Sequence, residues 1–151
     1  MTTRVNTLAH MDKLKPLGAY SMAAQQGLDP AIARLVEIRA SQINGCAVCL
    51  AMHTKEARQA GESEERIHML DAFRESGLYD DRERAALEWT EALTRLGPGG
   101  ASYETYANLE AHFSEDEQVK LTLLIGAINA FNRLNVGFRV SPHVLKDLEA
   151  A

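Results

Sequence analysis

Two cysteines and a histidine lie within eight residues of one another, in the segment INGCAVCLAMH, and the chain contains no other cysteine. If this segment is helical, Cys46, Cys49 and His53 share an arc of about 60° on one face. Cys49 and His53 are one turn apart, so the imidazole can take the thiol proton and leave a nucleophilic thiolate. At this spacing the Cα atoms of Cys46 and Cys49 stand about 5 Å apart, which suits a disulfide. The pattern predicts a redox dithiol with its own base.

Other interpretations of these residues are open at this point. Cysteines on a helix can be inert small hydrophobic side chains, but that leaves the coincident histidine unexplained. Zinc is the stronger alternative, because Cys46, Cys49 and His53 provide three suitable ligands. The fourth ligand would have to be a distant residue such as His10, His68, His112 or His143. A thioredoxin-type site is excluded, since its C-x-x-C follows a strand and the segment before Cys46 has a helical pattern.

The elements that must position this motif are predicted to be helices. Runs of β-branched residues with period-two alternation are missing from the sequence, so we expect no strands. Asp29 and Pro30 form a helix start signal, and the helix that they begin should end before Gly45. The motif helix then runs from about Cys46 to Ala60. Unpaired amide groups in its first turn should stabilise a thiolate.

The remaining segments are expected to form helices that pack around these two. Their predicted positions are Leu17–Gln26, Ser63 to Gly77, about Asp80 to Leu96, Ser102–Phe113, a long helix after Ser114, and a short one from Pro142. The helix after Ser114 has apolar residues on all sides, so it should form the centre of the bundle or an oligomer interface. Polar residues inside apolar patterns, namely Arg39, Asn129, Asn132 and Arg133, should find buried partners.

Length and composition limit the remaining possibilities. With 151 residues, 46% of them hydrophobic and 25% charged, the chain suits one domain spanning residues 1–151. A net charge of −5 argues against a nucleic-acid partner, and no apolar run is long enough to span a membrane. The N-terminal segment lacks the apolar stretch of a secretory signal, so we expect a cytoplasmic protein. In that compartment a close cysteine pair more often performs redox chemistry or binds a metal than forms a structural disulfide.

The motif and two later segments resemble a known family. IRASQINGCAVCLAMHTKEA, the helix containing DRERAALEW and the segment AINAFNRLN are similar to the AhpD-like alkylhydroperoxidase branch of the carboxymuconolactone decarboxylase family. The resemblance covers about residues 16–140, and its most specific part is N-G-C-x-x-C-x-x-x-H. It implies an all-α, single-domain helical bundle that assembles into trimers or hexamers and requires no flavin, haem or metal.

The resemblance also implies roles for individual residues. The second cysteine, Cys49, would attack a peroxide, and the first, Cys46, would close a disulfide on the resulting sulfenic acid. His53 would belong to a proton relay with a glutamate that commonly lies 12 residues before the first cysteine. This chain has Arg34 there, and the nearest glutamate is Glu37, three residues further on. We predict Glu37 as the relay residue, while its position off the apolar stripe, about 140° from Ile32 on a helical wheel, also fits a solvated glutamate.

The predicted function is therefore that of a thiol-dependent, alkylhydroperoxidase-like antioxidant enzyme. Its substrate would be a small-molecule peroxide, and its reductant an external dithiol, either a protein or a lipoyl-type group. One alternative is a zinc-stabilised helical binding module that uses Cys46, Cys49 and His53. The other is a lactone decarboxylase, as the wider family name suggests. The two cysteines speak against it, because the decarboxylase branch does not depend on a C-x-x-C pair.

Overall fold

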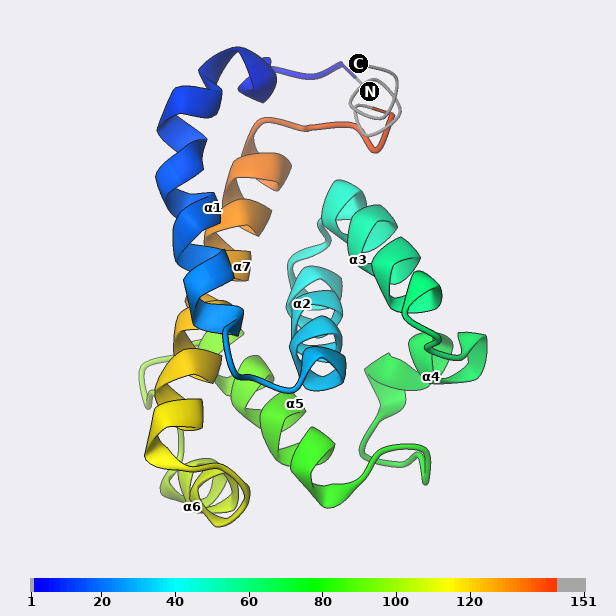
Figure 1. Cartoon of the computed structure of the whole chain (residues 1–151), viewed down its shortest axis with the longest axis vertical. Coiled ribbons are helices and arrows are strands. Elements are labelled where there is room, and N and C mark those ends of the chain that lie inside the picture. The colour runs from blue at the N-terminus through cyan, green and yellow to red at the C-terminus, as the bar shows by residue number, and fades with distance from the viewer. Residues whose placement is uncertain (1, 144–151) are drawn as a thin grey trace.

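A computed structural model describes residues 2–143, and every regular element in that range is helical, as predicted. In chain order the elements are η1 (Thr7–His10), α1 (Met11–Gln25), α2 (Pro30–Asn44), α3 (Ala47–Gln59), α4 (Glu64–Met69), η2 (Leu70–Ala72), α5 (Asp81–Thr94), α6 (Tyr103–His112) and α7 (Glu115–Gly137). Helices α3, α5 and α7 pack against α2, and α1 lies along α7 (Figure 1). None of the helices in residues 2–143 combines the length and apolarity needed to cross a bilayer.

The boundaries of α2 and α7 follow local capping chemistry that the sequence predicted. The Asp29 side chain accepts a hydrogen bond from the Ala31 amide at 2.8 Å, with Pro30 in the first turn. Helix α2 ends at Asn44, and its C-cap residue is Gly45, whose φ of 64° is left-handed and favours glycine. Ser114 and Glu117 form the capping box that begins α7. These caps fix where α2 stops and therefore where the cysteine motif begins.

Helix α1 is longer than the sequence analysis predicted. It begins at Met11 rather than Leu17 and contains Pro16. A proline inside a helix removes one backbone hydrogen bond, and this loss does not interrupt α1 at Pro16. The preceding turn η1 is capped instead by Asn6, whose side chain accepts from the Leu8 amide at 3.1 Å. The helix thus starts upstream and carries Pro16 in its second turn, which extends the face that α1 presents to the site.

The helix expected from Ser63 to Gly77 is shorter than predicted. It ends at Met69, and the chain continues through η2 into a non-helical segment. The Arg84 side chain explains the difference, because it donates hydrogen bonds to the carbonyl groups of Phe73, Arg74 and Ser76. A guanidinium on another helix thus satisfies backbone acceptors that a continuing helix would have used. The short helix expected from Pro142 falls largely on residues 144–151, outside the described part of the chain.

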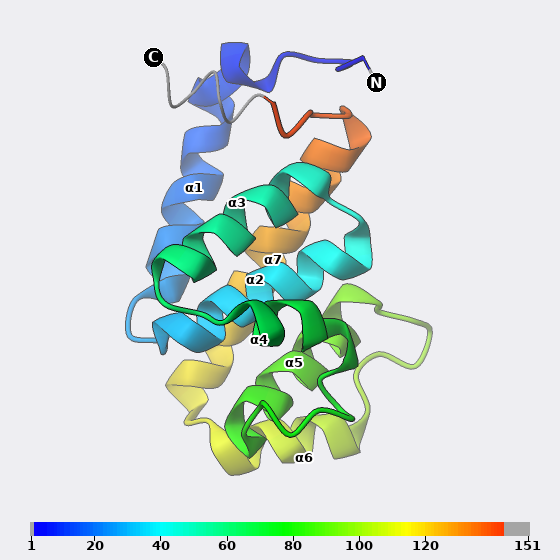
Figure 2. The ribbon, with the colours of Figure 1, turned by 90° about the vertical axis from the view of Figure 1, so that its right-hand side faces the viewer.

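The most buried helix is α2, so α7 does not form the centre of the bundle, which was one of the two positions predicted for it; the other, an oligomer interface, stays a prediction. In α2 every residue from Ile32 to Ser41 except Arg34 is buried. Helix α7 leaves Val119 and Leu123 exposed, by 59% and 38%. Figure 1 shows α2 between α7 and α3, and in Figure 2 α7 runs behind α2. A helix covered on all sides must bury its polar residues too, which places Arg39 and Glu37 in the interior.

The buried side chains of Arg39, Asn129 and Asn132 have partners, as expected, but Arg133 is exposed. The Arg39 Nε donates to Glu91 Oε1 at 2.8 Å, and the guanidinium also contacts Asp71. Asn44, the last residue of α2, donates its amide to Oδ1 of both Asn129 and Asn132 at 2.9 Å. These bonds tie the end of α2 to α7 immediately before the cysteines, so they hold the motif against the long helix.

Candidate active site

The two cysteines of the motif form a disulfide at the start of α3. Cys46 is the N-cap residue, Cys49 lies in the first turn, and their Cα atoms are 5.3 Å apart. The helix therefore begins one residue later than predicted. Both residues are buried, with exposed fractions of 1% and 2%. A reactant must therefore reach the sulfur atoms through a cavity rather than at an open surface.

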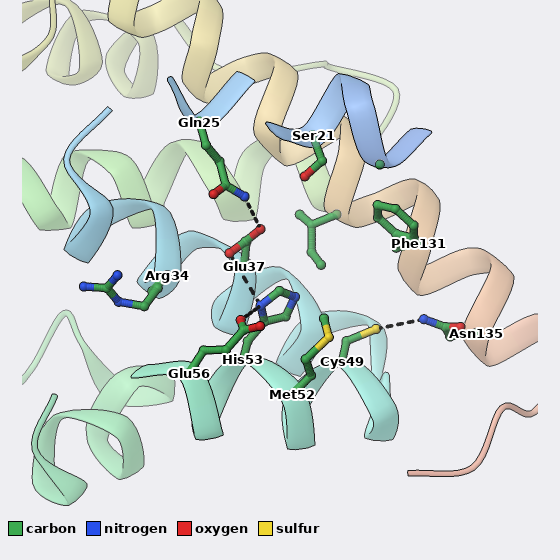
Figure 3. A pocket seen from close by; sticks show the side chains of 12 residues that line it. Ser21, Gln25, Arg34, Glu37, Cys49, Met52, His53, Glu56, Phe131 and Asn135 are labelled. Carbon is green, nitrogen blue, oxygen red and sulfur yellow. Dashed lines mark hydrogen bonds and ion pairs between the residues drawn. The ribbon is translucent and has the colours of Figure 1, made fainter. Parts of the chain in front are cut away.

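Such a cavity lies beside Cys49. We call it the site cavity; its volume is about 460 Å³, and α1, α2, α3 and α7 enclose it (Figure 3). Cys49, His53 and Glu37 all line it, so the structure brings three of the four predicted residues to one space. Cys46, the fourth, lines a separate hollow of about 440 Å³ between the start of α3 and the residues that follow α7. The disulfide thus connects residues that border two different cavities.

Two carboxylates face the same nitrogen of His53. The His53 Nδ1 lies 3.0 Å from Glu56 Oε2 and 3.5 Å from Glu37 Oε2. Gln25 donates a hydrogen bond of 2.9 Å to the other Glu37 oxygen. Glu37 is only 6% exposed, so it is not a solvated surface glutamate. In Figure 3 the imidazole stands between the carboxylates and the part of the cavity that Cys49 borders.

The two carboxylates differ in acidity because their environments differ. Burial raises the pKa of Glu37, and the nearby His53 only partly opposes this effect. The hydrogen bond with His53 lowers the pKa of Glu56, although partial burial acts in the other direction. Glu56 is therefore the carboxylate that stays ionised and orients the imidazole. Glu37 is displaced toward the pH range in which a buried acid can exchange protons.

Three residues around these groups were missed by the sequence analysis. Asn135 of α7 donates its side-chain amide to Cys49 Sγ at 3.3 Å. Its signal was the regular spacing of Asn129, Asn132 and Asn135, which places three amides on neighbouring turns of one helix. Glu56 could have been found from its position three residues after His53. Gln25 reaches Glu37 from a different helix, and no local pattern in the sequence predicts that contact.

Arg34 occupies the position at which the resemblance led us to expect a glutamate. Arg34 lines the site cavity together with Glu37, which lies one turn further along α2. The cavity therefore contains a carboxylate near the expected place, and also a cation that the family pattern does not imply. The positive charge of Arg34 acts to lower the pKa of both Glu37 and Glu56.

The zinc alternative gains no support from the geometry. Among residues 2–143, no group of three or more His, Cys, Asp and Glu side chains is placed to hold a metal ion. The two sulfur atoms are bonded to each other, and the Nδ1 of His53 faces carboxylates.

Comparison with known proteins agrees with this fold and motif. The model of the carboxymuconolactone decarboxylase family matches residues 9–92, more than half of the chain. The uncharacterised protein YdfG of Bacillus subtilis is 39% identical over 112 residues, which is 74% of this chain and 76% of YdfG. YnjA of Escherichia coli, also uncharacterised, is 35% identical over 109 residues, 72% of this chain and 59% of YnjA. The protein belongs to the carboxymuconolactone decarboxylase family.

Solved structures show that the fold is of the AhpD type. A protein of unknown function from Agrobacterium tumefaciens, provisionally named an antioxidant defence protein AhpD, superposes with a TM-score of 0.88. It is 43% identical, and the match covers 93% of this chain and 97% of that one. The debrominase Bmp8 shares the fold at a TM-score of 0.76 with 18% identity, over 88% of this chain and 72% of Bmp8.

Proposed function

We propose that this protein is a thiol peroxidase that reduces hydroperoxides with the Cys46–Cys49 dithiol. The observation that carries the proposal is the arrangement around the site cavity. One sulfur atom of a disulfide pair borders the same space as a histidine that is held by two carboxylates. A nucleophile, a base and a resolving thiol are the three groups that this chemistry needs. The family and the similarity to the Agrobacterium protein support the same assignment.

The reaction begins with the reduced protein. His53, connected to Glu37, takes the proton of the Cys49 thiol, and the thiolate attacks the terminal peroxide oxygen. The O–O bond breaks, an alcohol or water leaves with a proton from the relay, and Cys49 becomes a sulfenic acid. The Cys46 thiol then attacks that sulfur, the disulfide forms and water leaves. An external dithiol restores both thiols by exchange and is itself oxidised to a disulfide.

Treating the reduced protein with cumene hydroperoxide tests the proposal. We expect both thiols to disappear together as one intramolecular Cys46–Cys49 bond, with one equivalent of cumyl alcohol released per chain. Thiol titration, mass spectrometry and alcohol quantification measure these quantities. Thiol loss no faster than that of free cysteine, or thiol loss without alcohol, would contradict a peroxidase. The protein unfolded in urea serves as the control for intrinsic thiol reactivity.

The space beside Cys49 fits a peroxide with an organic substituent. A second cavity of about 440 Å³ adjoins the site cavity; it is lined by Met11, Met22 and Met52, and we call it the methionine cavity. Both cavities are bordered by Cys49 and by Gly18 of α1. A Cβ atom added at Gly18 meets nothing within 4 Å, so there is open space beside this residue for a side chain.

Substitution of Gly18 should therefore separate large peroxides from small ones. In Gly18→Leu we expect kcat/KM for cumene hydroperoxide to fall about tenfold or more, while that for hydrogen peroxide changes little. Helix α1 tolerates the change, since leucine is a better helix former than glycine. Gly18→Ala should give an intermediate effect, and Gly77→Ala, outside both cavities, should give none. Equal losses with both peroxides in Gly18→Leu would argue against a binding role for this space.

A further inference from the structure

Asn135 is the only one of three aligned asparagines on α7 that faces the reacting sulfur. Asn129 and Asn132 are engaged with Asn44 and with side chains of the helix bundle. The Asn135 amide instead points across to α3 and donates to Cys49 Sγ at 3.3 Å (Figure 3). Within residues 2–143 we find no comparable side-chain donor to the sulfur of Cys46. The two sulfur atoms of the disulfide are therefore unequally placed.

This inequality matters most when one sulfur carries a negative charge. A disulfide sulfur is a weak hydrogen-bond acceptor, so the bond to Asn135 contributes little in the oxidised protein. A thiolate accepts the same amide much more strongly, because hydrogen bonds to ionised groups are the strong ones. The contact therefore favours any state in which Cys49, and not Cys46, is the anion. His53 acts in the same direction, since it borders the same cavity as Cys49.

We propose that Asn135 sets the direction of the dithiol, so that the external reductant attacks Cys46 and forms its mixed disulfide there. The inference rests on the proposed function for its biological setting. In thiol exchange the sulfur that forms the more stable thiolate is the better leaving group. Cys49 is that sulfur, and its partner Cys46 is consequently the one attacked. Asn135 is thus a catalytic residue in both half-reactions.

Reduction of the disulfide proceeds in two exchange steps. A thiolate of the external dithiol bonds to Cys46 Sγ, the Cys46–Cys49 bond breaks, and Cys49 leaves as a thiolate with the bonding electron pair. The second thiol of the reductant then attacks the reductant's first sulfur atom, the one that is bonded to Cys46 Sγ. The reductant departs as a disulfide, and Cys46 receives the electron pair and a proton. Two electrons pass from the dithiol to the protein.

The two cysteines border different cavities, so the reductant and the peroxide can reach different sulfur atoms. Cys46 lines the hollow between the start of α3 and the chain after α7, where Arg139, Ser141 and His143 also lie. Cys49 lines the site cavity and the methionine cavity instead. Asn135 borders all three spaces. A reductant approaching Cys46 therefore has a route that does not pass through the space in which the peroxide reacts.

The first test measures the pKa of each cysteine separately, from the pH dependence of alkylation in reduced single-cysteine proteins. In Cys46→Ser, adding Asn135→Ala should raise the pKa of Cys49 by about one unit and slow alkylation at neutral pH about tenfold. In Cys49→Ser, the same asparagine change should leave the pKa of Cys46 unchanged. Asn135→Leu, which keeps the branched shape of the side chain but cannot donate a hydrogen bond, provides a second variant if the alanine form unfolds. Equal shifts at both cysteines would show a merely structural role and overturn the proposal.

The second test locates the mixed disulfide and requires no peroxide. Protein oxidised with diamide is mixed with glutathione and quenched with N-ethylmaleimide, and fragment-ion mass spectrometry assigns the two labels. We expect glutathione on Cys46 and maleimide on Cys49 in the wild type, with this preference weakened in Asn135→Ala. Glutathione on Cys49 in the wild type would reverse the direction. Because oxidation is chemical, this result is independent of whether the protein reacts with hydroperoxides.

Discussion

Replacing Cys49 with serine is expected to abolish peroxide reduction, while the same change at Cys46 should leave the first chemical step intact. Cys49 borders the site cavity with His53, and Cys46 does not. Loss of the nucleophile should lower the rate of alcohol formation by at least about 10³-fold, because the remaining thiol, Cys46, does not border the site cavity. Stopped-flow mixing of reduced protein with cumene hydroperoxide measures the rate of this step.

The two serine variants are matched controls for each other. Cys46→Ser should release one equivalent of alcohol at close to the wild-type rate and then stop, because no thiol remains to resolve the sulfenic acid. Dimedone should trap that sulfenic acid on Cys49. The opposite outcome, a fast-forming sulfenic acid on Cys46 in the Cys49→Ser protein, would exchange the roles of the two cysteines.

Local chemistry in the sequence was sufficient to predict most helix boundaries. Asp29 with Pro30, and Ser114 with Glu117, act on backbone amides within a few residues, so their effect does not depend on the rest of the fold. The predicted start of the first helix, at Leu17, was wrong, because α1 begins at Met11 and contains Pro16. A proline disfavours a helix locally, but the capped turn before it and the packing of α1 along α7 outweigh the one lost hydrogen bond.

The candidate site shows where sequence periodicity stops being informative. Cys49 and His53 were predicted to meet because four residues of helix join them. Glu37 was harder to place, since its angle on a helical wheel suggested a face away from the core. That argument assumes a helix with one buried side, whereas α2 is covered by α3, α5 and α7. Once every face is buried, the wheel no longer separates inside from outside.

Asn135 lies 86 residues from Cys49 in the sequence. The contact exists because Asn44 binds Asn129 and Asn132, which sets the alignment of α7 against the start of α3. A single sequence contains the three asparagines and their spacing, but not the partner they face. Long-range hydrogen bonds of this kind require the packing of the helices to be known first.

The Glu37→Gln variant should lose activity and gain stability at neutral pH, and the combination is specific to a buried relay carboxylate. Glutamine retains the shape of the side chain and an acceptor for Gln25 but cannot exchange a proton. We expect the rate constant for Cys49 oxidation to fall about 10²-fold, the usual contribution of a positioned acid–base group. His53→Gln should show a loss of similar size, since either change interrupts the same relay. Measuring both variants from pH 5 to pH 9 shows whether the pH-dependent limb of the wild-type profile disappears.

Burial raises the pKa of Glu37, and this shift determines the direction of the stability change. Protonation of Glu37 stabilises the folded protein fully below the unfolded-chain pKa, and this stabilisation is lost as the pH rises through the folded-state pKa. Glutamine does not titrate, so the melting temperature of Glu37→Gln should exceed that of the wild type by a margin that grows with pH. Glu56→Gln is the matched control: that carboxyl is half-exposed and its pKa is lowered, so its removal should give no such gain. A Glu37→Gln protein that loses activity and stability together would make this glutamate a structural support, and His53 would then act through Glu56 alone.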